Sequence, residues 1–346
     1  MKLLVIGNGL VGNKILQKVI RRGIKGIGTW YNTKKEAEYK QYKLDKTNKQ
    51  SVFEVMKTTR PDVVVDTGAM HNVDRCEREP EESHRINVDG TENVAKACNK
   101  YGSDMLFIST DYIFDGKTDK KYTENDNPNP TSIYAKHKLE AEKIVLESVD
   151  DAIVVRPSVI YGWDVVKDNF VTWAYKELKK GHSINIVDDQ YNNPTLADDL
   201  ADMIISLIEN KCRGVFHTAG SECLNRYEFT LEIAEVFGLD KSLVNPIKTE
   251  DLNQLAERPK KCCMDVDKIT KVLRRKPLSP YEGLTIMRNQ LEWKDQIVRY
   301  GGKIEKLFFI LLLTNSQKFH PEEIITSMDS NIRKLRGIRK LRGHEK

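Results

Sequence analysis

The stretch Lys2-Leu3-Leu4-Val5-Ile6-Gly7-Asn8-Gly9-Leu10-Val11-Gly12, close to the start of the chain, decides the fold. Its apolar run at residues 2–7 predicts a buried strand, and the apolar spacing at residues 11–22 predicts a helix. The intervening Gly-x-Gly-x-x-Gly permits a tight turn, and the helix N-terminus suits a pyrophosphate. We therefore expect a dinucleotide-binding unit, the alternative being a glycine-rich turn that binds nothing. The candidate cofactor residues are Gly7, Gly9, Leu10, Val11 and Gly12.

Strands and helices alternate beyond this unit through the first two-thirds of the chain. The pattern predicts an α/β fold, a Rossmann-type doubly wound parallel sheet with helices on both faces. A smaller C-terminal substrate-binding lobe should lie over the carboxyl edge of the sheet. The expected strands are residues 2–7, 24–31, 63–67, 104–109, 152–156 and 183–187, and the expected helices are 11–22, 51–58, 86–100 and 132–148.

We expect residues 1–293 to form one unit. The sheet core should comprise mainly residues 1–156 and 184–217, and the lobe mainly residues 157–183 and 218–293. Residues 294–346 are predicted to be a basic C-terminal extension.

The charge of the chain is concentrated in this extension. The net charge is +5, but the residues from Gln296 onward carry +6 and the remainder −1. The extension contains the tandem repeat Ile-Arg-Lys-Leu-Arg-Gly at residues 332–337 and 338–343. Such a segment could touch nucleic acid or an anionic membrane surface. A solvated helix or disordered extension is the favoured interpretation, and the repeat lacks the aromatic residues that single-stranded nucleic acid requires.

The six cysteines show no Cys-x-x-Cys spacing. They predict reduced thiols of a cytoplasmic protein, not a disulfide framework or a zinc site. We do not expect the adjacent Cys262 and Cys263 to form a structural disulfide. No signal peptide is expected, because Met1-Lys2 leads directly into a core strand. The longest apolar run, at residues 307–313, is too short to span a bilayer.

The end of the second expected strand bears on the choice of cofactor. Its sequence is Trp30-Tyr31-Asn32-Thr33-Lys34-Lys35, and no acid follows until Glu36. An acid at this place commonly holds the ribose hydroxyls of NAD, whereas lysines suit the 2′-phosphate of NADP. The sequence therefore favours NADP(H) over NAD(H), although a solvated lysine pair is a common alternative. Asn32 is a candidate cofactor residue, with an ordinary turn as the alternative.

A possible catalytic set follows the fourth expected strand. Tyr134 and Lys138 are four residues apart on an expected helix, which places them on one face. A nearby ammonium group favours the phenolate and lowers the pKa of a tyrosine. Such a phenol can exchange a proton with a sugar oxygen, and the Thr110 hydroxyl can hydrogen-bond the same oxygen. Alone, the Tyr-x-x-x-Lys pattern also occurs on many solvated helix faces.

Four further motifs narrow the class. They are Asp66-Thr67-Gly68-Ala69-Met70-His71-Asn72-Val73-Asp74, Ile86-Asn87-Val88-Asp89-Gly90-Thr91, Ser109-Thr110-Asp111-Tyr112-Ile113-Phe114-Asp115-Gly116 and Asp189-Gln190-Tyr191-Asn192-Asn193-Pro194-Thr195. Together with Tyr134 and Lys138, these motifs resemble the extended short-chain dehydrogenase/reductase superfamily and, within it, the RmlD-like dTDP-4-dehydrorhamnose reductase family. The resemblance covers about residues 1–293.

The resemblance implies NADP(H)-dependent reduction of a nucleotide-linked 4-keto-6-deoxy sugar by a cytoplasmic enzyme that could be a homodimer. It implies that Tyr134 donates the proton, Lys138 binds the nicotinamide ribose and Thr110 polarises the ketone. Further implied cofactor residues are Asp45 and Ala69. The implied substrate residues are Asp111, Tyr112, Asn169, Phe170 and Arg258.

The chain departs from the family pattern at several places. Its glycine motif is one residue shorter than Gly-x-x-Gly-x-x-Gly. Val159 stands where many bacterial members have a tryptophan that packs on the sugar. Some members bind magnesium at a dimer interface through an acid after the glycine loop. Lys14 occupies that position here, so no metal is expected.

Two other functions remain open from the sequence. One relative, the beta subunit of methionine adenosyltransferase, keeps the fold and cofactor site but serves a partner protein, so a non-catalytic regulatory subunit is possible. A sugar-nucleotide epimerase or dehydratase is the other alternative. The motif at residues 189–195 argues against it.

Overall fold

The computed structural model describes residues 1–34, 36–164 and 167–299. Residues 1–289 form one compact unit. The basic residues 300–346, including the tandem repeat, lie outside the described residues. No helix in the described part of the chain is both long enough and apolar enough to cross a bilayer.

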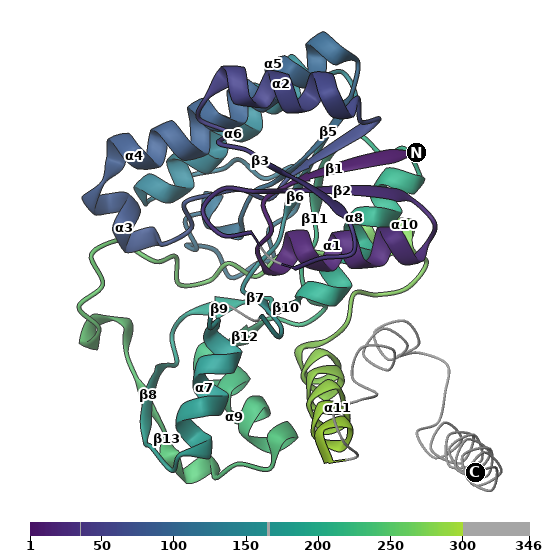
Figure 1. Ribbon diagram of the computed structural model, residues 1–346. Helices are drawn as coiled ribbons and strands as arrows, with labels where there is room; N and C mark the ends of the chain where they lie inside the picture. Colours follow the sequence, from purple (N-terminus) through teal and green to yellow (C-terminus); the bar gives the residue numbers. More distant parts are fainter. Residues whose placement is uncertain (35, 165–166, 300–346) are drawn as a thin grey trace, which may run out of the picture. The chain divides into compact units, whose positions relative to one another are not determined.

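The centre of the described chain is a seven-stranded sheet in the order β11-β6-β5-β4-β1-β2-β3. Every pair of neighbouring strands in it is parallel. This confirms the predicted doubly wound parallel sheet (Figure 1). The strands are β1 (Lys2–Ile6), β2 (Lys25–Trp30), β3 (Lys40–Lys43), β4 (Val63–Asp66), β5 (Asp104–Ile108), β6 (Ala152–Arg156) and β11 (Gly214–His217).

Helices cover both faces of this sheet. Alternate residues of β1 enter different cores: Leu3 and Val5 meet α1 and α8, whereas Leu4 and Ile6 meet α2 and α5. Because neighbouring side chains of a strand point to opposite faces, β1 is buried on both sides. The helices are α1 (Leu10–Arg21), α2 (Lys49–Thr59), α3 (Val73–Arg78), α4 (Pro80–His84), the π-helical turn η1 (Arg85–Asp89), α5 (Gly90–Tyr101), the short η2 (Asp111–Ile113), α6 (Ile133–Ser148), α8 (Ala197–Glu209) and α10 (Asp267–Leu273).

A separate hydrophobic cluster holds together the smaller lobe, seen below the sheet in Figure 1. Its centre includes Tyr161, Phe229 and Leu284, which are almost fully buried. The lobe comprises β7 (Ile160–Tyr161), α7 (Phe170–Lys179), β8 (Ile184–Val187), β9 (Tyr191–Asn192), β10 (Thr195–Leu196), β12 (Leu224–Asn225), α9 (Arg226–Phe237), η3 (Lys241–Leu243), β13 (Val244–Ile247), η4 (Thr249–Asp251) and the first half of α11 (Pro280–Arg299).

Of residues 184–217, which were assigned to the sheet core, the part at 184–196 was placed wrongly, because it forms β8, β9 and β10 of the lobe. A strand does form at residues 184–187, but β8 pairs with β13 in a two-stranded sheet of the lobe. The reason is visible in its burial: Ile184 and Ile186 are buried while Asn185 is exposed. Strand β4 of the central sheet is buried at all four positions. An alternating strand suits a sheet with one solvated face.

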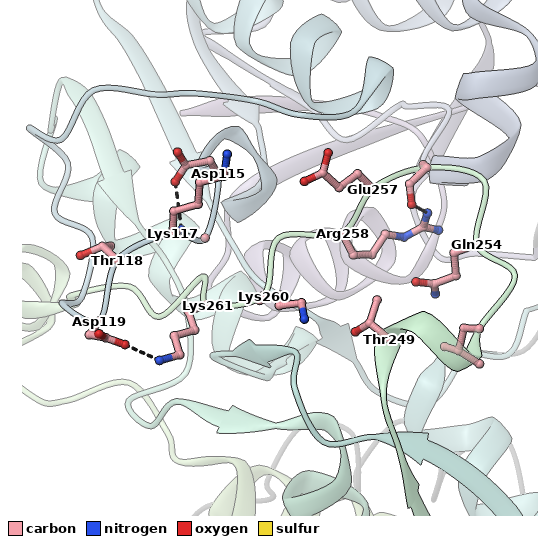
Figure 2. A pocket seen from close by; sticks show the side chains of 13 residues that line it. Asp115, Lys117, Thr118, Asp119, Thr249, Gln254, Glu257, Arg258, Lys260 and Lys261 are labelled. Carbon is pink, nitrogen blue, oxygen red and sulfur yellow. Dashed lines mark hydrogen bonds and ion pairs between the residues drawn. The ribbon is translucent and has the colours of Figure 1, made fainter.

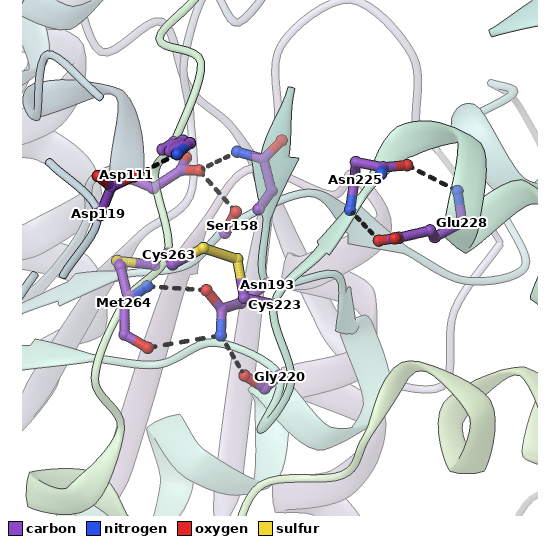
Figure 3. Close-up of a disulfide and its surroundings, with 12 residues drawn as sticks. Asp111, Asp119, Ser158, Asn193, Gly220, Cys223, Asn225, Glu228, Cys263 and Met264 are labelled. Atoms are coloured by element: carbon purple, nitrogen blue, oxygen red, sulfur yellow. Dashed lines mark hydrogen bonds and ion pairs between the residues drawn. A yellow bond between two sulfur atoms is a disulfide. The ribbon is translucent and has the colours of Figure 1, made fainter. Parts of the chain in front are cut away.

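The interpretation of all six cysteines as reduced thiols was also wrong. Cys223 and Cys263 form a disulfide across 40 residues of sequence (Figure 3). The bond joins the segment before β12 to the segment between η4 and α10. Chain spacing alone could not predict this pair, because the fold brings the two residues together. Cys262 remains free and buried, so the adjacent pair itself is not bonded.

Candidate active site

The predicted site residues are brought to one edge of the central sheet. Because all its strands are parallel, their carboxyl ends share that edge. Gly7 follows β1, Gly68 and Ala69 follow β4, and Thr110 follows β5. Tyr134 and Lys138 come to it from the first turns of α6.

The glycine loop permits no side chain at two of its three glycines. Gly7 has φ of +100°, in the region that favours glycine. A Cβ on Gly12 would lie 2.2 Å from the carbonyl oxygen of Gly7. A Cβ on Gly9, by contrast, would meet no atom within 4 Å. The loop therefore packs tightly against the rest of the protein at Gly7 and Gly12, whereas Gly9 has free space beside it.

The first turn of α1 faces this open space without a side-chain cap. Gly9 is the N-cap residue, and Leu10 and Val11 follow it in the first turn. The backbone N–H groups at a helix start lack helical partners and attract anions. The Asn8 amide donates to the carbonyl oxygen of Thr33 at 2.8 Å, which ties the loop to the segment after β2.

The remaining candidate cofactor residues lie beside the same edge. Asp45 accepts hydrogen bonds from the backbone N–H and hydroxyl of Thr47, at 2.9 and 2.8 Å. Asn32 is exposed, whereas Ala69 is half-buried. The loop that carries Ala69 is clamped by Asn87, whose amide pairs with both the N–H and the carbonyl of Met70.

A buried ion pair beneath that loop had no signal in the sequence. The Lys46 ammonium donates to the Asp66 carboxylate at 2.7 Å, to the Gly68 carbonyl at 2.7 Å and to the Thr91 hydroxyl at 3.0 Å. Lys46 and Asp66 are both buried. From the sequence alone, Lys46 could equally be an exposed lysine next to Asp45. The fold is therefore needed to identify its ion pair with Asp66.

Tyr134 and Lys138 lie on α6, which begins where the Ser132 hydroxyl accepts a hydrogen bond from the backbone of Ala135. The Lys138 ammonium donates to the carbonyl oxygen of Ile108 at 2.5 Å and lies 3.9 Å from the ring centre of Phe107. The Thr110 hydroxyl lies close enough to Tyr134 to lower the pKa of its phenol. The structure thus brings the predicted catalytic set together.

The protonation preferences of this set differ from the sequence-based expectation. Burial raises the pKa of Tyr134, and the nearby Thr110 hydroxyl opposes that rise. Burial lowers the pKa of Lys138 to about 7, with a further contribution from the positive charge of Lys46. The expectation that Lys138 lowers the pKa of Tyr134 was therefore wrong. The Tyr134 phenol is therefore protonated at neutral pH.

Asp111 and Tyr112, two predicted substrate residues, form η2 directly after Thr110. The Asp111 carboxylate accepts hydrogen bonds from Thr110, Ser158 and Asn192, and burial raises its pKa. Burial likewise raises the pKa of Tyr112. Asp111 therefore links the end of β5 to the lobe strand that contains Asn192.

The predicted substrate residues of the lobe have structural partners of their own. Asn169 caps α7 in a reciprocal arrangement with Thr172, and its amide donates to the Gly162 carbonyl at 2.6 Å. Phe170 is stacked on Phe229, with ring centres 6.1 Å apart, and the Arg226 guanidinium lies 5.0 Å from its ring centre.

Arg258 lines a cavity of about 600 Å³ between residues 115–119 and 249–261 (Figure 2). Its guanidinium donates to the Asp74 carboxylate at 2.6 Å and to the Ala256 carbonyl at 2.5 Å. Lys117, Lys260 and Lys261 also line the cavity, whereas Thr110, Tyr134 and Lys138 do not. Lys260 pairs with Asp189, and Lys261 with Asp119. Nothing in the sequence pairs Asp74 with Arg258, which lies 184 residues further along the chain.

No cluster of three potential metal ligands occurs among the described residues. Lys14, the residue at the position where some relatives carry an acid, forms an ion pair with Asp198 at 2.9 Å.

Residues 1–292 match the family described as the RmlD substrate binding domain. The chain belongs to that family. The membership confirms the resemblance to RmlD-like proteins of the extended short-chain dehydrogenase/reductase superfamily.

Individual relatives agree with this membership. The chain is 33% identical over 237 residues to a dTDP-4-dehydrorhamnose reductase of Aggregatibacter actinomycetemcomitans, covering 65% of this chain and 80% of the relative. It is 30% identical to the Bos taurus methionine adenosyltransferase 2 subunit beta, over 78% of this chain and 81% of the relative. The solved dTDP-4-dehydrorhamnose reductase of Bacillus anthracis, in complex with NADP, superposes with a TM-score of 0.75 at 28% identity, covering 84% of this chain and 100% of that one. The predicted oxidoreductase class is thus confirmed at the level of the family.

Proposed function

We propose that the protein reduces a nucleotide-linked 4-keto-6-deoxy sugar with a nicotinamide dinucleotide, and that the substrate is dTDP-4-dehydrorhamnose, reduced to dTDP-rhamnose. The observation that carries the proposal is the placement of Thr110 after β5 and of Tyr134 and Lys138 on α6, at the same sheet edge as the glycine loop. The reductases among the relatives support the class of substrate.

The glycine loop fits a dinucleotide. Gly9 has open space where a side chain would otherwise stand, and the uncapped start of α1 offers backbone N–H groups to a pyrophosphate. Asp45, Asn32 and Ala69 would lie along the adenosine side of the same edge. Lys138 would bind the nicotinamide ribose.

Reduction of a ketone needs a hydride at carbon and a proton at oxygen. When bound, a reduced nicotinamide is the source of that hydride. The Tyr134 phenol, held protonated by burial, gives its proton to the oxygen as negative charge grows there. The Thr110 hydroxyl lies beside the same oxygen, and the Ile108 carbonyl fixes the position of the Lys138 ammonium. The products are the secondary alcohol and an oxidised dinucleotide.

We propose NADP(H) as the preferred cofactor. Lys34 follows the end of β2 and is exposed, and no acidic residue lies between Trp30 and Lys34. A cation at this place stabilises a 2′-phosphate, whereas an acid would bind the ribose hydroxyls of NAD.

The nucleotide half of the substrate would occupy the cavity beside Arg258. Its lining carries four cations and three carboxylates, and Lys117 and Arg258 come from opposite sides of it. Asn169 and Phe170 would approach the substrate from the lobe. We also propose a homodimer, as the family resemblance implies.

A second function is favoured by one comparison. The 30% identity to methionine adenosyltransferase 2 subunit beta extends over 78% of the chain. A regulatory subunit would bind the dinucleotide and a partner enzyme without turnover. Purification with and without a methionine adenosyltransferase, followed by an activity assay of each, separates the two functions.

The test of the proposed function is a substrate panel with a matched variant. Nucleotide-linked 4-keto sugars are offered with NADPH and with NADH, and loss of nicotinamide absorbance is followed. We expect turnover by the wild type with NADPH. Tyr134→Phe should lower kcat by about 10²-fold or more, since a general acid is lost, while dinucleotide affinity stays nearly unchanged. Full kcat in Tyr134→Phe would exclude Tyr134 as the proton donor.

A further inference from the structure

Asp111 is a carboxyl group buried directly behind the proposed catalytic residues. Only 3% of its surface is exposed. One carboxylate oxygen, Oδ2, accepts hydrogen bonds from the Ser158 hydroxyl at 2.6 Å and the Asn192 amide at 2.9 Å. The other, Oδ1, accepts the Thr110 hydroxyl at 3.2 Å. Figure 3 shows Asp111 and Ser158 turned toward each other. Both oxygens are therefore used by the protein itself.

No cation forms an ion pair with Asp111 within the part of the chain that the structure describes. The groups that face it electrostatically are Arg226 at the start of α9, Tyr112 on η2, Tyr134 on α6 and Cys262. Of these, only Arg226 carries a positive charge. Burial therefore raises the pKa of the Asp111 carboxyl despite three hydrogen bonds that favour its charged form.

The hydroxyl of Thr110 cannot form a hydrogen bond with every polar group around it at the same time. A threonine hydroxyl has one hydrogen and two acceptor lone pairs. One lone pair accepts the backbone N–H of Tyr112 at 3.2 Å. The single hydrogen is directed at Asp111 Oδ1, while the same hydroxyl is near enough to Tyr134 to lower the pKa of its phenol. Asp111 and any acceptor on the substrate side of Thr110 thus compete for the one hydroxyl hydrogen.

We propose that Asp111 is a positioning residue whose charge state sets the direction of the Thr110 hydrogen bond. An ionised Asp111 takes the hydrogen of Thr110, which can then only accept a hydrogen bond from Tyr134. A neutral Asp111 donates its own hydrogen to Thr110, and the hydrogen of Thr110 turns to the ketone oxygen. No proton leaves Asp111 in the reaction; the carboxyl group acts through Thr110.

The same carboxyl group also connects the reacting side to the lobe. Ser158 follows β6 and Asn192 lies in β9, so both donors to Oδ2 come from segments that precede or form the lobe. Their hydrogen bonds hold the carboxyl plane, which fixes Oδ1 toward Thr110. The inference rests on the proposed function, because Thr110 is assigned to the ketone oxygen there.

A double-mutant cycle tests the inference through activity. Asp111→Asn supplies an amide that mimics the neutral carboxyl group, and Thr110→Val removes the hydroxyl at nearly constant shape. The wild-type kcat should fall by about tenfold as rising pH ionises Asp111, because a donor to the developing oxyanion is lost. Asp111→Asn should abolish that dependence. The double variant should match Thr110→Val within about twofold, since two residues that act as a unit are not additive.

If the kcat of the double variant fell by the product of the two single-variant losses, Asp111 would act without Thr110, and the inference would be overturned. An unchanged pH dependence in Asp111→Asn would do the same. Asp126→Asn is the matched control, because Asp126 is an exposed carboxylate that binds the Thr123 hydroxyl and backbone. It should keep the wild-type profile.

A second measurement needs no substrate. The Asp111 carboxyl is titrated by NMR in protein with isotope-labelled aspartate, with Asp111→Asn assigning the signal. Thr110→Val should raise the pKa of Asp111, since a hydrogen bond to the charged form is removed, and Thr110→Ser should restore it. The same pKa in all three proteins would refute the inference. Failure of the wild type to reduce any sugar, with the shift present, would count against the proposed function alone.

Discussion

The two halves of the sheet edge are built by different means. The half around the glycine loop is shaped by backbone: Gly7 and Gly12 admit no side chain, and the start of α1 offers bare N–H groups. The half around Arg258 is shaped by side chains that meet from distant segments, such as Asp74 with Arg258 across 184 residues. We call these the cofactor half and the substrate half. The first depends on close steric approach, and the second on partners that can be changed one at a time.

The largest effect should come from a single methyl group in the cofactor half. Gly12→Ala would place a Cβ 2.2 Å from the Gly7 carbonyl oxygen, so the backbone must shift. We expect a loss of more than about 3 kcal/mol in the free energy of unfolding, in the range of overpacked cores, with little dinucleotide binding. Denaturant unfolding and dinucleotide titration measure the two effects.

Gly9→Ala is the matched control for this steric account. Its Cβ would meet no atom within 4 Å, so the free energy of unfolding should stay within about 0.5 kcal/mol of wild type. Dinucleotide affinity should still fall, because the methyl group enters the open space. Equal destabilisation by the two alanines would contradict the distinction between Gly9 and Gly12.

The second largest effect should come from the disulfide between Cys223 and Cys263. Cys223→Ser removes the bond to Cys263, which closes 40 residues of chain. We expect the free energy of unfolding to fall by about 2–4 kcal/mol. Unfolding with and without a reductant measures it: the reductant should destabilise the wild type and leave Cys223→Ser unchanged. A wild type indifferent to reductant would show that the bond does not contribute.

The third effect is a pH dependence centred on Lys138, at the boundary of the two halves. Its pKa in the folded protein is about 7, against 10.5 for an ordinary lysine. Between these values the unfolded chain binds the proton and the folded protein does not, so stability should rise with pH in this window and stay lowest below pH 7. The expected slope is about 1 kcal/mol per pH unit relative to Lys138→Met, measured by unfolding in a pH series. A flat difference would contradict the buried environment of Lys138.

The smallest effect is expected in the substrate half. Arg258→Ala should raise KM for the sugar nucleotide by about fivefold with little change in kcat, because a partly exposed cation contributes about 1 kcal/mol. Asp74→Asn keeps a hydrogen-bond acceptor for Arg258 and should have a weaker effect. Glu257→Gln, at an exposed neighbour in the same cavity, is the control. A larger change in kcat than in KM would place Arg258 at the reaction and not at binding.

The contrast between the halves also explains what the sequence could predict. Glycine spacing and apolar periodicity are local, and they predicted the glycine loop and six of the strands to within a few residues. Strand β3, with two exposed and two half-buried residues, carried no apolar pattern and was not predicted. The substrate half depends on pairs such as Asp111 with Asn192 and Cys223 with Cys263. Spacing along a chain does not determine such contacts. For the same reason β8 was predicted in the central sheet, although it pairs with β13 in the lobe.

The most direct test of the account is the stoichiometry of one reaction. Wild-type protein is mixed with NADPH and a limiting amount of dTDP-4-dehydrorhamnose, and nicotinamide absorbance and product are followed together. The account predicts one equivalent of NADPH oxidised per equivalent of sugar reduced, with dTDP-rhamnose as the product. Tight dinucleotide binding with no oxidation, or conversion of the sugar without net loss of NADPH, would contradict it.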